Sequence, residues 1–524
     1  MRKIYITLGV LLLGVIAMAY LYFSNLNTEA NANNISLNAV AKEASIVFSF
    51  DNDKSFYEIL SGQDLLQNVL GKEKSEDLKS LRANLVNHQE IFNQLEGQRI
   101  YIGILPGLEN TVDFLISTQL KANSDPVKIL SNLKSSKIQV EKVKDIYKLS
   151  FTDSTNCFVG IKDKLVLISN SALSVENNLT SQKIEKGFVD YIKSNSRPNK
   201  NTLANLYINF NNIPLLLKNI LNSSLTGELH IFSQQNTYAA FSYNFSKEKL
   251  LFNGNTDINA NNYFNLFSKI PEQKININNI LPTKTANYTI YAVNDYADWR
   301  KKLIDLQAGR NETEKLNKNI TSINQTYRLD IEQIFNKYCN HQFVSFQLNT
   351  GEKFGAIALT NGEKLNQLLL DLSAEYATDI RIFKDANIPY LFFGDPFKKF
   401  ERPFYTIIDN YLVMANNASS INSFLNSYRN GNLLINDEDY RGLTDQLSTS
   451  ATISFYINNK NSNDIFGRNL KRPYYKQYQS KDGLKNYEAF SYQLSGGNGR
   501  FLSNILLYKK AEKIIEADTL NTNK

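Results

Sequence analysis

The 524-residue sequence predicts an α+β protein: an N-terminal transmembrane helix followed by two tandem, duplicated modules, each an antiparallel sheet with helices packed on it. Three observations lead to this fold class. An uncharged apolar segment precedes the body of the chain, short apolar-alternating segments are joined by tight polar turns, and one stretch occurs twice at a long interval. Alternating apolar positions are typical of strands, and tight turns between them favour antiparallel pairing.

The apolar segment Ile4–Phe23 has 20 residues and no charge. A helix of that length is about 30 Å long, the thickness of a bilayer core. Arg2 and Lys3 precede it, so the positive-inside rule places the N-terminus in the cytoplasm. We therefore expect a signal-anchor in a single-pass protein of the inner (cytoplasmic) membrane, with its body in the periplasm or outside. Cleavage after Ala32 is the alternative, because Ala30-Asn31-Ala32 has the small-x-small form of a signal-peptide site.

The repeated stretch reads as a β-hairpin followed by an amphipathic helix. It occupies Cys157–Asn170 in the first copy and Phe404–Asn417 in the second. Two further matches share one offset of 249 residues: Leu206–Asn209 with Phe455–Asn458, and Ala240–Tyr243 with Ala489–Tyr492. An offset this long indicates duplicated domains, because solenoid repeats span roughly 20–50 residues.

These patterns predict the organisation of the chain. The expected segments are a transmembrane anchor at 1–25, a polar stalk at 26–36, a first α+β module at 37–257, a linker at 258–278, a second α+β module at 279–510 and a polar C-terminal tail at 511–524.

In the first copy, the clearest helix places apolar residues on one face from Leu78 to Leu95, and Gly97 follows as its stop. A shorter helix starts at Ser124-Asp125-Pro126, where a capping residue precedes proline. Strands are expected at 44–50, 100–104, 112–120, 138–143, 146–151, 203–210, 229–232, 238–245 and 250–255, and further helices after Asn170, at 184–192 and at 213–221.

The second copy retraces this order. Strand 287–293 opens it, and helical stretches at 296–306 and 311–337 follow. The remaining elements are strands 343–348 and 354–359, a helix at 365–372, the hairpin, a helix at 421–428 and one opened by Asp437-Glu438-Asp439. Acidic residues at a helix start suit the positive end of the helix dipole.

Part of the second copy resembles a known family. The residues that carry the likeness are Asp409–Val413, Asn416-Asn417, the 419–428 helix, Asp437–Tyr440 and Ser454–Asn458. The family is the bacterial domain of unknown function numbered 3352, found in exported, membrane-anchored proteins. The first copy departs from the pattern, because Lys162-Asp163-Lys164 replaces the Asp-Asn-Tyr turn. The resemblance implies a location and an architecture, but no activity and no catalytic residues.

Charge and cysteine content exclude several classes of protein. The net charge of +7 is a weak bias over this length, which argues against a dedicated nucleic-acid surface. Two cysteines, Cys157 and Cys339, make neither a disulfide framework nor a zinc site, and we expect two independent buried thiols.

No residue set predicts catalysis, a cofactor or a metal site. His88 lies on a predicted apolar stripe, His230 in a strand, and Cys339-Asn340-His341 lacks the further ligands that a metal needs. Gly496-Gly497-Asn498-Gly499 lies between two strands and is not followed by Lys-Ser/Thr, so a hairpin turn explains it better than a phosphate loop. Asp437-Glu438-Asp439 could bind a cation, but a helix start accounts for it.

The best interaction candidate is the segment 468–481, in which basic residues alternate with tyrosines. Its members are Arg468, Lys471, Arg472, Tyr474, Tyr475, Lys476, Tyr478 and Lys481. Such interleaving can bind nucleic acid by charge and stacking, but the expected location argues against that partner. We interpret the segment as a solvated loop; the alternative is a contact with an envelope protein, an anionic glycan or lipid headgroups.

The sequence therefore predicts a non-enzymatic, membrane-anchored interaction or scaffold protein of the bacterial envelope. A second hypothesis is a binding module for a lipid or anionic ligand in a cleft between the two modules, because two similar halves can form a cleft at their junction. A third hypothesis is a hydrolase, for which no catalytic motif is found.

Overall fold

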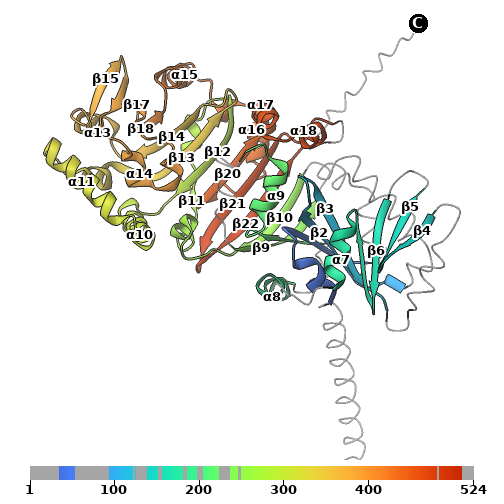
Figure 1. Cartoon of the computed structure of the whole chain (residues 1–524). Helices are drawn as coiled ribbons and strands as arrows, with labels where there is room; N and C mark the ends of the chain where they lie inside the picture. Colours follow the sequence, from blue (N-terminus) through green and yellow to red (C-terminus); the bar gives the residue numbers. More distant parts are fainter. Residues whose placement is uncertain are drawn as a thin grey trace, which may run out of the picture. The chain divides into compact units, whose positions relative to one another are not determined.

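The computed structural model describes residues 35–52, 94–121, 124, 138–151, 156–180, 186–196, 204–223, 237–245, 249–480 and 483–509. These residues divide into two compact units, which meet in the sequence between Asn219 and Ile220. Apart from one short two-stranded ladder, the described strands form two long antiparallel series, with eight strands in the first unit and twelve in the second. Figure 1 shows these strands with their helices. Helices accompany the strands in both units, which agrees with the α+β class.

The first unit has the strand order β8-β1-β2-β3-β7-β6-β5-β4. Its strands are β1 (Ile46–Asp51), β2 (Arg99–Pro106), β3 (Val112–Gln119), β4 (Ile138–Val143), β5 (Ile146–Phe151), β6 (Asn156–Lys162), β7 (Leu165–Ser169) and β8 (Asn205–Asn209). Its labelled helices are α7 (Ala172–Thr180), α8 (Lys186–Asn195) and α9 (Ile213–Ile220), which reaches the unit boundary.

The hairpin β6–β7 and helix α7 form the predicted repeated element of the first unit. The turn contains Asp163 at φ +54°, a conformation that short polar side chains tolerate. Helix α7 packs closely on β6, because a Cβ on Gly160 would meet the side chains of Val175 and Leu179. A glycine at this position therefore lets the helix approach the sheet.

The second unit has the strand order β9-β10-β22-β21-β20-β12-β13-β14-β18-β17-β16-β15. These strands are β9 (Tyr238–Phe245), β10 (Lys249–Thr256), β12 (Thr285–Ala292), β13 (Cys339–Leu348), β14 (Lys353–Leu359), β15 (Ser373–Ala377), β16 (Ile380–Phe383), β17 (Phe404–Ile408), β18 (Tyr411–Ala415), β20 (Ile453–Asn458), β21 (Ala489–Gly497) and β22 (Arg500–Tyr508). A separate two-stranded ladder pairs β11 (Gln273–Lys274) with β19 (Ser450–Ala451).

The helices of the second unit agree with the predicted positions in most cases. They are α10 (Tyr296–Gly309), α11 (Thr313–Tyr327), α12 (Ile331–Tyr338), α13 (Gly362–Leu368), α14 (Ile388–Phe393), α15 (Ala418–Arg429), α16 (Glu438–Thr444), α17 (Asn459–Asn469) and α18 (Arg472–Tyr478). The predicted helical stretch 311–337 is two helices, because Arg328 adopts φ +54° and Asp330 caps the start of α12.

Eight strands follow the same order in both units. The series β8-β1-β2-β3-β7-β6-β5-β4 corresponds strand for strand to β20-β12-β13-β14-β18-β17-β16-β15. The 249-residue offset also maps β9 onto β21 and β10 onto β22. This equivalence of order is what two copies of one ancestral unit would produce.

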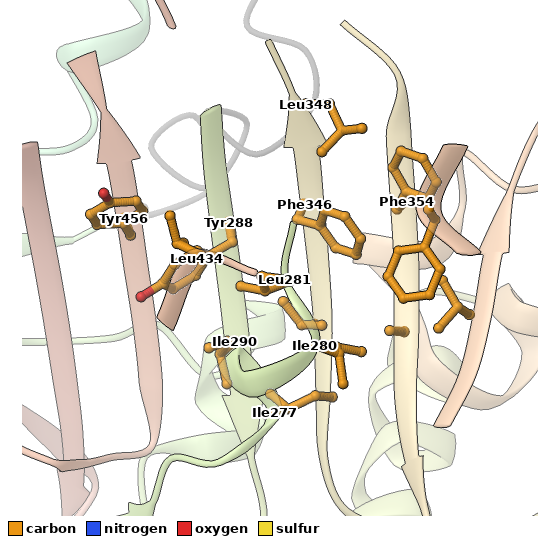
Figure 2. Close-up of a cluster of buried hydrophobic side chains, with 14 of the residues drawn as sticks. Ile277, Ile280, Leu281, Tyr288, Ile290, Phe346, Leu348, Phe354, Leu434 and Tyr456 are labelled. Carbon is orange, nitrogen blue, oxygen red and sulfur yellow. The ribbon is translucent and has the colours of Figure 1, made fainter. Parts of the chain in front are cut away.

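One face of the second sheet carries an aliphatic and aromatic core. Figure 2 shows Tyr456, Tyr288, Phe346 and Phe354 on four neighbouring strands. Tyr288 stacks on Tyr456 and Phe346 stacks on Phe354, each with ring centroids 4.9 Å apart. Such pairs bury a large apolar area and stabilise the sheet across its strands.

Helices cover the opposite face of that sheet. They pack on it with an aromatic cluster around Trp299 of α10. Trp299 is 1% exposed and packs on Phe343 of β13 and on Phe267. Phe267 belongs to the 3-10 helix η3 (Tyr263–Phe267), which lies in the predicted linker 258–278. The segment is therefore part of a core and differs from the expected linker.

The unit boundary also differs from the predicted end of the first module at residue 257. Strands β9 and β10 belong to the second unit, because β10 pairs along its whole length with β22. The sequence pattern identifies both strands correctly, but a periodic pattern does not show which strand is the neighbour.

The predicted transmembrane helix is corrected by the structure. Ile4–Phe23 lies outside the described residues, and no helix within the described ranges is long and apolar enough to cross a membrane. The longest of those helices, α11, has 15 residues and a largely polar surface, whereas a spanning helix needs about 20 apolar residues. Within the described residues, this finding contradicts the signal-anchor, the single-pass topology and the inner-membrane location predicted from the sequence.

Candidate functional site

Helix α17 is attached to the start of β12 by polar side chains in its first turn. Asn458 caps the helix, since its side chain accepts a hydrogen bond from the N–H of Asn461. The Asn461 side-chain amide donates to the carbonyls of Thr283 and Thr285, both at 2.9 Å. The Ser462 hydroxyl donates to the Ala286 carbonyl at 3.0 Å. These bonds fix where the basic segment that follows can lie.

The segment predicted as a solvated loop contains a helix, α18, which follows α17 after a short connection (Figure 1). Pro473 stands in its first turn, where a missing N–H carries no cost. The proline is a local signal for a helix start, but the interleaving of basic and aromatic residues also suits a loop. Packing against α17 favours the helix over the loop.

The tyrosines of α18 hold it against α17. Tyr478 is 8% exposed, its hydroxyl donates to the Asn459 carbonyl at 3.2 Å, and its ring meets Phe466 edge-on at 5.0 Å. Burial raises the pKa of Tyr478 to about 12. Tyr475 stacks on Tyr478 with centroids 6.1 Å apart, and Tyr474 is half-buried. The buried and stacked rings serve packing, so they are not available to stack on nucleic-acid bases.

Three of the predicted basic residues are exposed: Arg468, Arg472 and Lys476. We call these three side chains the α18 basic surface. Arg472 and Lys476 are four residues apart and so lie on one side of α18. Within the described residues none of the three has a recorded ion pair; Arg468 Nε donates to the Asp464 backbone carbonyl at 3.2 Å. Lys481 lies outside the described residues.

The charge around this surface is locally concentrated. Residues 459–478 contain five basic side chains and one acidic side chain, Asp464. The net charge of the whole chain is only +7, so these 20 residues carry most of it. The weak charge bias of the whole chain therefore does not describe this segment, in which positive charge is concentrated. Clustered like charges raise the local positive potential and favour an anionic partner.

One residue of this region was missed by the sequence analysis. The Asn222 side-chain amide donates to the carbonyls of Leu470 at 2.9 Å and Arg468 at 3.2 Å. The N–H of Lys471, which is half-buried, donates to the Ile220 carbonyl at 2.9 Å. The segment 220–222 thereby holds the junction between α17 and α18. Its signal in the sequence is that Leu221 and Leu470 differ by the repeat offset.

The other candidate residues are placed in structural roles or outside the described ranges. His88 and His230 lie outside them, and His341 is exposed on β13. Cys157 and Cys339 are both buried and form no disulfide, and burial raises the pKa of the Cys339 thiol. Among the described residues no group of three or more potential metal ligands is found.

The acidic motif Asp437-Glu438-Asp439 lies at a helix start, and the glycine-rich motif 496–499 lies at a hairpin turn. Asp437 caps α16, since its carboxylate accepts a hydrogen bond from the N–H of Tyr440 at 3.0 Å. Gly497 pairs with Arg500 at the end of the β21–β22 hairpin, and Asn498 and Gly499 turn the chain with positive φ.

Comparison with known proteins adds no assignment: no family model, no curated protein and no solved structure matches this chain. The resemblance of the segment 405–458 to a domain family of unknown function stays an expectation from its residues.

Proposed function

We propose that this protein is a non-enzymatic interaction protein, and that the α18 basic surface binds an acidic surface on a partner protein. The observation that supports the proposal is the local charge: five basic side chains against one acidic side chain in residues 459–478. Arg468, Arg472 and Lys476 are exposed, so a partner can reach them without unfolding any element.

The fixed position of these three cationic side chains and the type of their charged groups both suit a partner that carries carboxylates. The buried Tyr478 and the amide of Asn461 hold α17 and α18 in place, so binding orders little additional structure. Two of the three residues are arginines, whose planar guanidinium matches carboxylate geometry better than an ammonium does. Charges at the rim of an interface mainly raise the association rate and select the partner.

The proposal is tested with the full chain and a fluorescent polyglutamate peptide as an acidic probe. Arg468→Gln, Arg472→Gln and Lys476→Gln are combined in one variant, and binding is measured by anisotropy at several salt concentrations. We expect the dissociation constant to rise about tenfold or more, because three exposed contacts of about 0.5–1 kcal/mol each are lost.

The matched control removes the same net charge elsewhere. Lys302, Lys315 and Lys318 are exposed lysines of α10 and α11, and their replacement by glutamine should leave binding nearly unchanged. Equal losses in both triple variants would mean that net charge alone attracts the probe, and the assigned surface would be wrong. Binding to anionic lipid vesicles but not to the peptide would favour the lipid hypothesis instead.

A further inference from the structure

Arg468 differs from the other two members of the α18 basic surface in the way its side chain is held. Its Nε donates a hydrogen bond to the Asp464 carbonyl at 3.2 Å, one turn earlier in α17. Within the described residues its Nη1 and Nη2 make no hydrogen bond, so their four N–H groups can be offered to a partner. The guanidinium is thus tied at one nitrogen and keeps two others for recognition.

The turn between β13 and β14 restricts the same guanidinium from another side. Gly351 stands in this turn with φ +103°. A Cβ on Gly351 would lie 3.3 Å from Nη2 of Arg468 and 3.6 Å from its Nη1. The guanidinium therefore lies beside the backbone of the turn, which limits the directions in which the long side chain can move.

The backbone of Arg468 is fixed as well. Its carbonyl accepts a hydrogen bond from the Asn222 side-chain amide at 3.2 Å, and the next carbonyl, of Asn469, accepts one from the Asn222 N–H at 2.8 Å. A Cβ on Gly467 would lie 3.2 Å from the ring of Tyr475, so α17 and α18 approach closely directly before Arg468. Both the main chain and the side chain of Arg468 therefore have a defined position.

Arg472 and Lys476 carry the same charge without such support. Their side chains are exposed, and within the described part of the chain neither makes a hydrogen bond or an ion pair. A partner that binds them has to order two long side chains, whereas Arg468 is largely ordered before the partner arrives. A contact made by a side chain that is already ordered costs less conformational entropy.

We infer that Arg468 is the anchor of the α18 basic surface: its held guanidinium takes a carboxylate of the partner through two parallel N–H···O bonds, whereas Arg472 and Lys476 attract the partner by charge alone. The inference rests on the proposed function, because it assigns unequal roles within the same binding surface. It makes the geometry of one arginine, rather than the number of cations, the main source of affinity.

A lysine at position 468 separates geometry from charge. Arg468→Lys keeps one positive charge but replaces a planar fork of N–H donors by a single ammonium group. A two-bond contact with a carboxylate is lost in this variant, and the charge that attracts the partner is retained. Arg472→Lys is the matched control, because it makes the same chemical change on an exposed side chain four residues further along the chain.

The test uses the full chain and the fluorescent polyglutamate peptide, with anisotropy measured at several salt concentrations. We expect Arg468→Lys to raise the dissociation constant at least fivefold at every salt concentration, and Arg472→Lys to raise it less than twofold. The dependence of binding on salt should be the same in both variants as in the wild type, because the number of charges is unchanged. Urea unfolding should also be unchanged, because the Arg468 side chain is exposed.

The possible failures are distinguishable. If the wild-type chain does not bind the peptide, the proposed function fails, and the inference fails with it. If the wild-type chain binds and the two lysine variants lose affinity equally, the three cations are equivalent, so the basic surface stands and Arg468 is not its anchor. A loss of affinity in Arg468→Lys that is matched by a loss of stability would mean that Arg468 supports α17 instead of contacting the partner, which also overturns the inference.

Discussion

At the scale of single residues, the polar side chains of the β17–β18 turn support local structure. The Tyr428 hydroxyl donates to the Asp409 carboxylate at 2.6 Å, and the Gly362 N–H donates to the Asn410 side chain at 2.9 Å. The turn thus contacts both the start of α13, at Gly362, and the end of α15, at Tyr428. Asp409 and Asn410 are among the residues on which the expected family resemblance was based, and in this structure both have local structural roles.

Buried tyrosines give the protein an expected weakness at alkaline pH. Tyr101 is 4% exposed, and burial raises its pKa to about 12 from the ordinary value near 10. The folded state therefore keeps this proton longer than the unfolded state does. The contribution of this pKa difference to the stability of the folded state is fully present below pH 10, and it is lost as the pH rises from 10 to 12.

The variant Tyr101→Phe tests this effect by urea unfolding between pH 8 and 11.5. Below pH 10 the difference in unfolding free energy between wild type and variant should be constant. Above pH 10 it should move in favour of the variant by up to about 1.4 kcal/mol per pH unit, because phenylalanine has no proton to lose. A difference that stays constant up to pH 11.5 would contradict the prediction.

At the scale of elements, α17 shows how a helix with few apolar residues is held on a sheet. Its buried contacts include Ile465, but its first turn is fixed mainly by amide and hydroxyl groups that satisfy carbonyls of the 283–286 segment. A carbonyl that loses such a donor in a partly buried place is costly. The position of the α18 basic surface therefore depends on a few hydrogen bonds.

Asn461→Ala should lower the unfolding free energy by about 1–3 kcal/mol, because it leaves the carbonyls of Thr283 and Thr285 without this donor. Chemical denaturation measures the loss, and the peptide affinity of the α18 basic surface should fall with it. Lys460→Ala, at an exposed site in the same helix turn, is the matched control and should change stability by less than about 0.5 kcal/mol. Equal effects of both substitutions would show that these bonds contribute nothing specific.

At the scale of the whole molecule, β22 is the last described strand in the sequence, but it does not lie at an edge of its sheet. β22 lies between β10 and β21 in the order of the second unit. Strands β10 and β22 are separated by roughly half the chain. During synthesis β10 therefore cannot pair with β22 until residues 500–508 have been made. Long-range pairing of this kind slows folding, because loop closure precedes the contacts that stabilise it.

Two leucines on β22 test how far the unit depends on that strand. Leu506 is 0% exposed in the core cluster, and Leu502 is 64% exposed. Leu506→Asp should destabilise the unit by more than about 4 kcal/mol and yield insoluble or protease-sensitive protein, because a carboxylate is buried without a partner. Leu502→Asp should stay within about 0.5 kcal/mol of wild type. Soluble, protease-resistant Leu506→Asp protein would mean that the ladder closes without this strand.

The sequence by itself determined the α+β class, most of the strands and the repeat offset. Each of these depends on residues that are close together in the chain: strand 287–293 was expected and β12 is Thr285–Ala292, and the hairpin at Phe404–Asn417 appears as β17 and β18. The basic residues of the segment 468–481 were recognised as a group in the sequence, because charge is a property of composition; their role as a binding surface stays a prediction.

The tertiary structure alone decided which strands are neighbours and which candidates remain accessible. In the structure β10 pairs with β22, and the predicted linker is part of an aromatic core. The predicted loop contains helix α18, and Asn222 lies at the α17–α18 junction. None of these follows from local periodicity, because strand pairing and burial are selected by the free energy of contacts between residues far apart in the sequence.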